Sequence, residues 1–328
     1  MRNLKCPRRT FLHLAAAAAT LPLAPLTARA QSYPSRPVRI IVPVGAAGVT
    51  DIIARLMGQW LTERLGQPFV IENRPGANSN IATETVVRAA PDGHTLLLAT
   101  AANAGNATLY DKLNFNFIRD IAPVAGIMVV PLVMVVHPSF PATTVPEFIA
   151  YAKANPGKVN MGLAGTGGSD HMAGELFKTM TGVNMTQVPY RGLAPALTDL
   201  LGGQVQVIFS SIPAAIEYIR AGKLQALAVT SAVRAEALPD LLTVGEFVPG
   251  FETSQWYGIA VPKSTPAEIV NKLNNEINAG LADHKMKARL VDLGGTVLAG
   301  SPAEFGKLIA DETEKWAKVI RAVNIKAD

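Results

Sequence analysis

The chain has 328 residues, of which 49% are hydrophobic and 17% charged, with a formal net charge of +5 and one cysteine. This length exceeds what one hydrophobic core usually organises, which favours two domains. A single cysteine excludes an internal disulfide and a metal site built from several cysteines.

Residues 1–30 have the three parts of a secretory signal peptide: a basic start, an alanine- and leucine-rich stretch, and a small-residue cleavage site at 28–30. The apolar stretch contains two prolines and is too short for a membrane anchor. Arg8 and Arg9 resemble a twin-arginine signal, with an ordinary secretory signal as the alternative. We therefore expect cleavage after Ala30 and a periplasmic mature protein.

Removal of this segment changes the charge of the chain. The segment holds five basic residues and no acidic one, so the mature chain has no net charge. It also contains the only cysteine, Cys6. Nothing in the mature composition therefore points to nucleic acid or an anionic membrane as a partner, or to thiol chemistry.

Short apolar runs alternate with helical patterns along the mature chain. The apolar runs predict strands over residues 38–42, 95–99, 132–136, 159–163, 205–209, 224–230 and 259–261. The helical patterns predict helices over residues 51–65, 81–90, 145–154, 173–181, 195–201, 213–221, 266–282 and 302–323. This alternation is typical of an α/β fold with largely parallel sheets.

Two of the strand-to-helix turns consist almost entirely of small residues. The first contributes the candidate ligand-binding residues Val44, Gly45, Ala46, Ala47, Gly48, Thr50 and Asp51. The second contributes Gly165, Thr166, Gly167, Gly168 and Ser169, together with His171 at the start of the following helix. Each ends at a helix N-terminus, where unpaired backbone N–H groups and the helix dipole favour an anion. Facing each other, the turns would clamp a carboxylate; alternatively, the small residues only permit tight strand-to-helix packing.

Catalytic and cofactor motifs are poorly represented. Ser169, Asp170 and His171 are the residue types of a catalytic triad, but adjacent residues at a helix start point in different directions. His171 and Glu175 have the i, i+4 spacing of metal ligands, yet no second pair completes a site, so a structural pairing is expected. The sequence contains no dinucleotide-binding, phosphate-loop or Gly-x-Ser-x-Gly motif. We predict a binding protein without a cofactor or metal, and not an enzyme.

Several sequence blocks then occur in a characteristic order along nearly the whole mature chain. They are Val42-Pro43, Thr50 to Arg55, Glu72 to Ala77, Ala89 to Leu98, Val188 to Gly192, Pro195 to Val205 and Trp256 to Gly258. Together they resemble the Bug family, the extracytoplasmic receptors of tripartite tricarboxylate transporters. The resemblance implies a type II periplasmic-binding-protein fold that closes over a small organic acid. We expect domain 1 to comprise residues 31–130 and 255–328, and domain 2 residues 131–254.

By this resemblance, the two turns hold a carboxylate through backbone amides and hydroxyls. Tyr190, Arg191 and Gly192 would border the same cleft, with Arg191 preferred over Arg74 for a second carboxylate. One departure concerns the first turn, where the family usually has Pro-Ala-Gly-Gly and this chain has residues 45–48, Gly-Ala-Ala-Gly.

Further candidates lie at the ends of other strands. Thr100 and Asn103 follow strand 95–99 in a small, polar stretch that we interpret as a turn, and cleft residues collect at strand ends. Trp256 and Tyr257 could flank a ligand, or could pack in the core.

The leading hypothesis is a periplasmic receptor that captures a small carboxylate and delivers it to the permease subunits of a tripartite tricarboxylate-type transporter. One alternative is a ligand-loaded receptor that informs a sensor kinase. Another is an exported hydrolase or isomerase that uses His171 and Glu175.

Overall fold

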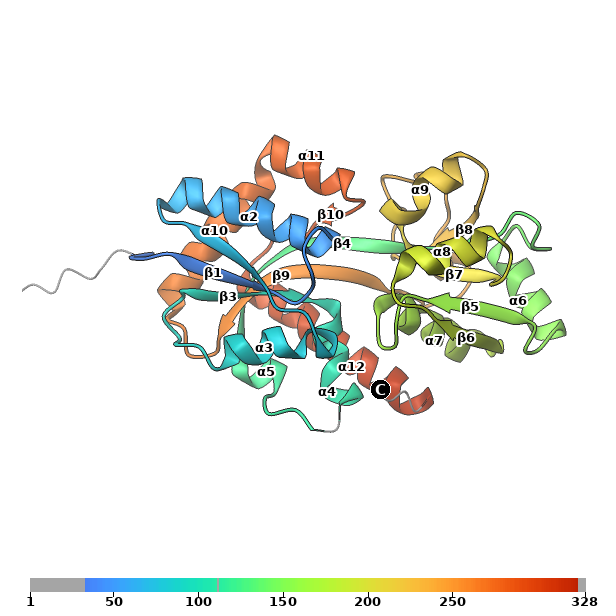
Figure 1. Cartoon of the computed structure of the whole chain (residues 1–328), viewed down its shortest axis with the longest axis horizontal. Helices are drawn as coiled ribbons and strands as arrows, with labels where there is room; N and C mark the ends of the chain where they lie inside the picture. The colour runs from blue at the N-terminus through green and yellow to red at the C-terminus, as the bar shows by residue number, and fades with distance from the viewer. Residues whose placement is uncertain (1–32, 111, 324–328) are drawn as a thin grey trace, which may run out of the picture. The chain divides into compact units, whose positions relative to one another are not determined.

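The computed structural model describes residues 33–110 and 112–323 (Figure 1). The predicted signal peptide and Cys6 therefore lie outside the described residues. The strands are β1 Val38–Val42, β2 Phe69–Asn73, β3 Thr95–Thr100, β4 Ile121–Val136, β5 Val159–Leu163, β6 Met185–Pro189, β7 Val207–Ser211, β8 Gln225–Val229, β9 Ser254–Pro262 and β10 Thr296–Val297. The α-helices are α2 Val49–Leu65, α3 Asn80–Val87, α4 Ala101–Leu109, α5 Phe117–Asp120, α6 Val145–Ala154, α7 Ser169–Thr181, α8 Leu193–Leu201, α9 Ile212–Arg220, α10 Ala267–Ala282, α11 His284–Asp292 and α12 Pro302–Val323. Two short 3₁₀ helices, η2 Ala77–Ser79 and η3 Val244–Glu246, complete the described elements.

The strands form one mixed sheet in which β4 is shared by two groups of neighbours. The order is β2-β1-β3-β9-β4-β7-β5-β6, with β10 and β8 also pairing with β4. Up to Pro131, β4 pairs with β9, and from Leu132 onward it pairs with β7 and β8. We call the group β1, β2, β3, β9 and β10 the first half-sheet, and β5, β6, β7 and β8 the second. Both β4 and β9 extend toward the second half-sheet (Figure 1).

The sequence of β4 explains how it serves two packing layers. In the stretch Leu132–Val136, alternate side chains point to opposite faces of the sheet. Leu132 and Met134 belong to the core cluster that contains Phe148 of α6 and Phe177 of α7. Val133 belongs to the cluster formed with α8 and α9. The uninterrupted apolar run of β4 thus reflects burial on both faces.

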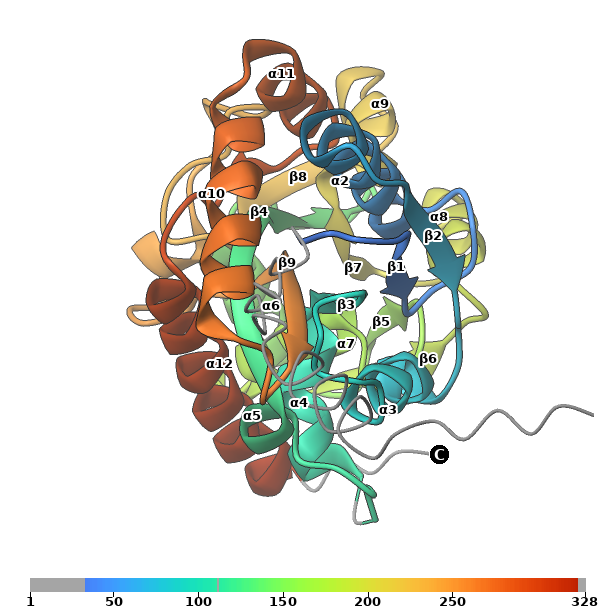
Figure 2. The same cartoon turned by 90° about the vertical axis from the view of Figure 1, so that its left-hand side faces the viewer.

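The larger core cluster continues from one half-sheet to the other. It joins Ala104 of α4 and Trp316 of α12 with residues of α6 and α7. Helix α12 packs against α4, α7 and β4, so it contacts elements on both sides. Figure 2 shows α12 on the same side of the molecule as α10. By its contacts, the described chain from Pro34 onward is one compact unit. The predicted two-domain boundaries therefore stay a prediction.

Two sequence-based expectations are wrong in detail. The sheet is not largely parallel, because β4 and β9 run antiparallel to each other and to their other partners.

The second correction concerns residues 101–106, which form the start of α4 rather than a turn. Asn103 accepts a hydrogen bond from the Thr100 backbone N–H at 2.9 Å, which is the pattern of a helix N-terminus.

Candidate ligand-binding site

Both small-residue turns lead directly from a strand into a long helix. The first connects β1 to α2, and the second connects β5 to α7. The N-cap residues, Gly48 and Gly168, have extended backbone and no side chain that could cap the helix. Neither helix therefore has an N-cap side chain on its first-turn N–H groups, while in α7 the Asp170 carboxylate itself accepts from the backbone N–H groups of Asp170 and His171.

Asp51 supports the first turn from behind. Its carboxylate accepts hydrogen bonds from the Ala47 backbone N–H at 3.0 Å and from the Arg55 side chain at 2.8 Å. Asn73 donates both to Asp51 at 2.8 Å and to the Val44 carbonyl at 3.0 Å. The hydrogen bond from Arg55 lowers the pKa of Asp51 to about 2, although burial opposes the shift. Asp51 is buried, and these hydrogen bonds let it shape the turn.

Asp170 and His171 play the corresponding part in the second turn. The Asp170 carboxylate accepts a hydrogen bond from the Ala164 backbone N–H, and burial raises its pKa. The His171 Nδ1 atom accepts from the Gly167 N–H at 2.9 Å. Gly167 has a φ of 78°, and a Cβ there would lie 2.6 Å from the Leu109 side chain of α4. Glycine is therefore favoured here, because the φ is positive and because a side chain would meet α4.

A cavity of about 160 Å³ lies between the two helix N-termini. Its lining comprises Val44, Thr50, Asn78, Ser79, Thr100, Ala101, Ala102, Gly168, Ser169, Gln255, Trp256 and Tyr257. The volume is that of roughly five water molecules in the liquid. None of these described lining residues is charged, so recognition of an anion would rest on backbone N–H groups, hydroxyls and amides.

The segment that contributes Asn78 and Ser79 has an uncommon backbone. Ala77, Asn78 and Ser79 have φ values of 45°, 48° and 79° without being glycine. Asn106 of α4 holds this segment, since its Nδ2 atom donates to the Asn78 carbonyl at 2.6 Å and to Asn80 at 2.8 Å. Such conformations persist where the surroundings enforce them, and they concentrate at binding sites.

Comparison with known proteins decides the family. Residues 53–325 match the family described as "Tripartite tricarboxylate transporter family receptor". The chain is 36% identical over 300 residues to Protein BugT of Bordetella pertussis, an alignment that covers 90% of this chain and 92% of BugT. The chain belongs to this receptor family.

Solved structures agree with this assignment. The R. palustris protein Rpa4515, solved with adipate, superimposes with a TM-score of 0.79 at 38% identity, covering 90% of this chain and 99% of Rpa4515. MatC from Rhodopseudomonas palustris, solved with bound malate, gives 0.75 at 33% identity, covering 88% of this chain and 100% of MatC. These are solute-binding receptors with the predicted α/β periplasmic-binding-protein fold, and the family is not one of enzymes.

Within this receptor, the predicted site residues fall into two groups. Those that line the cavity are Val44, Thr50, Thr100, Gly168 and Ser169. Those that do not line it are Gly45, Ala46, Ala47, Gly48, Asp51, Asn103, Gly165, Thr166, Gly167, His171, Tyr190, Arg191 and Gly192. The second group includes Asp51 and His171, which accept backbone hydrogen bonds from the two turns, as well as exposed residues such as Arg191.

Several members of the second group have structural partners. Asn103 is buried and donates to Thr83 at 2.8 Å, behind the cavity wall. The Tyr190 hydroxyl donates to Asp199 at 2.6 Å, and burial together with this carboxylate raises the pKa of Tyr190 to about 12. Arg191 is exposed.

Asn78, Ser79 and Gln255 line the cavity but were not predicted. Asn78 and Ser79 directly follow the Glu72 to Ala77 block, which marked their surroundings but not their role. Gln255 precedes the Trp256 to Gly258 block in the same way. The aromatic Trp256 both lines the cavity and packs edge-on against Phe305 of α12, at 5.6 Å between ring centroids.

The hydrolase alternative finds no geometric support around α7. Glu175 pairs with Lys178 at 2.7 Å and also accepts from Gln187, while the His171 Nδ1 atom accepts from the Gly167 backbone N–H.

Among residues 33–110 and 112–323, no three His, Cys, Asp or Glu side chains are grouped to hold a metal ion. In the same residues, no helix combines the length and apolar character that crossing a membrane requires.

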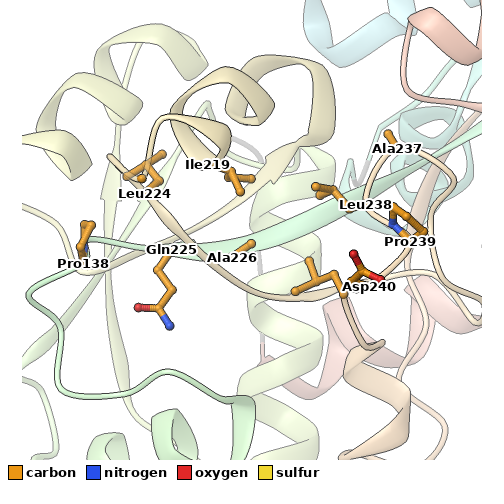
Figure 3. A pocket seen from close by; sticks show the side chains of 11 residues that line it. Pro138, Ile219, Leu224, Gln225, Ala226, Ala237, Leu238, Pro239 and Asp240 are labelled. Atoms are coloured by element: carbon orange, nitrogen blue, oxygen red, sulfur yellow. The ribbon is translucent and has the colours of Figure 1, made fainter.

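A second, larger cavity of about 520 Å³ lies between α9, β8 and residues 237–241 (Figure 3). Its lining is mostly apolar, and its one charged member is the exposed carboxylate of Asp240. Apolar walls and a negative charge disfavour an anionic ligand. The smaller cavity is therefore the better candidate site for this receptor.

Proposed function

We propose that the chain is an exported receptor that binds a small organic carboxylate between the N-termini of α2 and α7. The observation that carries the proposal is the cavity itself, which lies between two helix ends without N-cap side chains and contains no charged lining residue. Helix N-termini favour a negative group, and small residues allow it to come close. The relatives solved with adipate and with malate support this ligand class.

The binding proposal is tested by thermal unfolding of the mature chain with a panel of mono-, di- and tricarboxylates that includes adipate and malate. A ligand that binds only the native state at a hundredfold excess over its Kd stabilises it by about 2.7 kcal/mol. We expect at least one carboxylate to raise Tm. If no member of the panel does so, carboxylate binding is refuted.

We further propose that the two domains expected from the sequence have their boundaries at residues 130/131 and 254/255, and that the ligand draws the two domains together. The change of β4 partners at Pro131 and Leu132 supports this division. Closure of two domains around a ligand is a common response of such folds. Solution scattering would show a smaller radius of gyration at ligand saturation, whereas an unchanged radius would contradict closure.

The last part of the proposal concerns export and delivery. The N-terminal sequence pattern supports cleavage after Ala30, and the family assignment supports transfer of the ligand to transporter subunits. Mass spectrometry of the exported protein should find Gln31 as its first residue. Cross-linking of the loaded receptor in its native membrane should recover a permease subunit, and recovery of a sensor kinase alone would overturn the delivery role.

A further inference from the structure

A row of side-chain hydrogen bonds crosses the wall of the candidate cavity from one helix N-terminus to the other. It begins at Thr50 in the first turn of α2, whose hydroxyl donates to the Tyr257 hydroxyl. The Tyr257 hydroxyl donates to Gln255 Oε1 at 2.9 Å. Gln255 Nε2 donates to Ser169 Oγ, the first residue of α7, at 2.6 Å. All four residues line the cavity.

The chemistry of the Gln255 amide gives this row a direction. An amide oxygen only accepts hydrogen bonds, and an amide nitrogen only donates them. Because Tyr257 occupies the oxygen, the nitrogen is directed at Ser169, and the Ser169 oxygen acts as acceptor. The hydrogen of the Ser169 hydroxyl is therefore not used within the row.

The buried position of Tyr257 keeps the row in this state. The side chain is 4% exposed, and burial raises the pKa of its hydroxyl to about 12. The hydroxyl is thus protonated and able to donate throughout the neutral pH range. Gln255 and Tyr257 both come from β9, which lies between β3 and β4, so a rigid strand holds them.

We propose that Gln255 and Tyr257 are positioning residues, which turn the Ser169 hydroxyl hydrogen toward a carboxylate oxygen of the ligand. This inference rests on the proposed function and adds a reason for the ligand class. In a row with the opposite direction, Ser169 would donate its hydrogen to the Gln255 amide oxygen and could offer a ligand only the lone pairs of its own oxygen, so the site would favour a hydrogen-bond donor. In the observed direction the Ser169 hydroxyl hydrogen is available, and it pairs best with an acceptor such as a carboxylate oxygen.

The size of the effect follows from hydrogen-bond energetics. A hydrogen bond to a charged group contributes about 1.5–3 kcal/mol, so Ser169→Ala should weaken carboxylate binding at least tenfold. Tyr257→Phe leaves the Ser169 hydroxyl in place but releases the amide that orients it. We expect a weaker effect, about 3- to 10-fold, the range of a neutral hydrogen bond.

The test is a double-mutant cycle measured by titration calorimetry, with the carboxylate from the adipate and malate panel that binds the wild-type chain most tightly. If Tyr257 acts through Ser169, the double variant should bind no more weakly than Ser169→Ala alone, within about twofold. Tyr151→Phe on α6 removes a hydroxyl elsewhere and serves as the matched control, with unchanged affinity expected. Thr50→Val, at the far end of the row, provides a second cycle should Tyr257→Phe fail to fold.

The outcomes separate the two proposals. If the wild-type chain binds no carboxylate of the panel, the proposed function fails and the positioning role fails with it. If the wild-type chain binds but Tyr257→Phe has wild-type affinity, the positioning role alone is overturned. The same holds if the effects of Tyr257→Phe and Ser169→Ala multiply in full, because Tyr257 would then act independently of Ser169.

Discussion

Replacing Ala47 with glycine should stabilise the protein, although Ala47 lies in the proposed binding turn. Ala47 has a φ of 73°, a left-handed conformation that costs a residue with a Cβ roughly 1–2 kcal/mol. Glycine avoids this cost, but its freer unfolded chain offsets about 0.4–1 kcal/mol. The side chain is exposed, so little packing is lost, and the backbone N–H can still donate to Asp51. We expect a net gain of about 0.5–1 kcal/mol in the free energy of unfolding.

Urea unfolding of the mature chain measures this gain, with Ala46→Gly as the matched control. Ala46 is also exposed but does not have a positive φ, so glycine there should lower the free energy of unfolding by about 0.4–1 kcal/mol. The two variants should therefore change stability in opposite directions. If Ala47→Gly destabilised the chain as Ala46→Gly does, the left-handed conformation of Ala47 would be refuted.

Two further predictions concern the residues that shape the turns. Asp51→Asn should lower the free energy of unfolding at pH 7 by roughly 1–3 kcal/mol, because the charged bond with Arg55 is lost. The pKa of Asp51 is lowered from 3.8 to about 2, so the native contribution is complete above pH 4 and disappears as pH falls through 2. Urea unfolding should thus show the variant and wild type converging from pH 4 to pH 2, and an equal difference at both would contradict the pairing. Gly167→Ala should lower stability by about 1–3 kcal/mol, since it strains a positive φ and brings Cβ against Leu109; an unchanged Tm would exclude this close approach.

The parts of the site that the sequence predicts are those encoded by local pattern. An apolar run, a stretch of small residues and a helical pattern follow one another at residues 38–65, and again at residues 159–181. These runs place Thr50 and Ser169 at helix N-termini, where the structure has them. The order of residue types along the chain is therefore enough to predict the residues at the two ends of the cavity.

The remaining wall depends on contacts between distant parts of the chain. Gln255 reaches the cavity because β9 inserts between β3 and β4, and nothing near residue 255 indicates which strands it will join. Asn78 and Ser79 adopt positive φ without the glycine that usually reveals such a turn. The antiparallel direction of β9 has the same cause, since an alternating pattern does not show how a strand returns after a long connection.

The role of Asp51 and His171 illustrates a different difficulty. Both are polar residues at a helix start within a candidate site, so their types suggest contact with a ligand. The structure shows that each instead accepts a backbone hydrogen bond from its own turn, at 3.0 Å from Ala47 and 2.9 Å from Gly167. Sequence position alone does not distinguish a residue that shapes a turn from one that faces the cavity.

The central claim is that a carboxylate occupies the space between the N-termini of α2 and α7. Titration calorimetry tests it most directly, with the carboxylate that raises Tm most, applied to the wild-type chain and to Ser169→Trp, whose indole would fill the cavity. The account predicts one saturable site in the wild-type chain and no measurable binding to a folded Ser169→Trp variant. Unchanged affinity in that variant would place the ligand elsewhere and contradict the account.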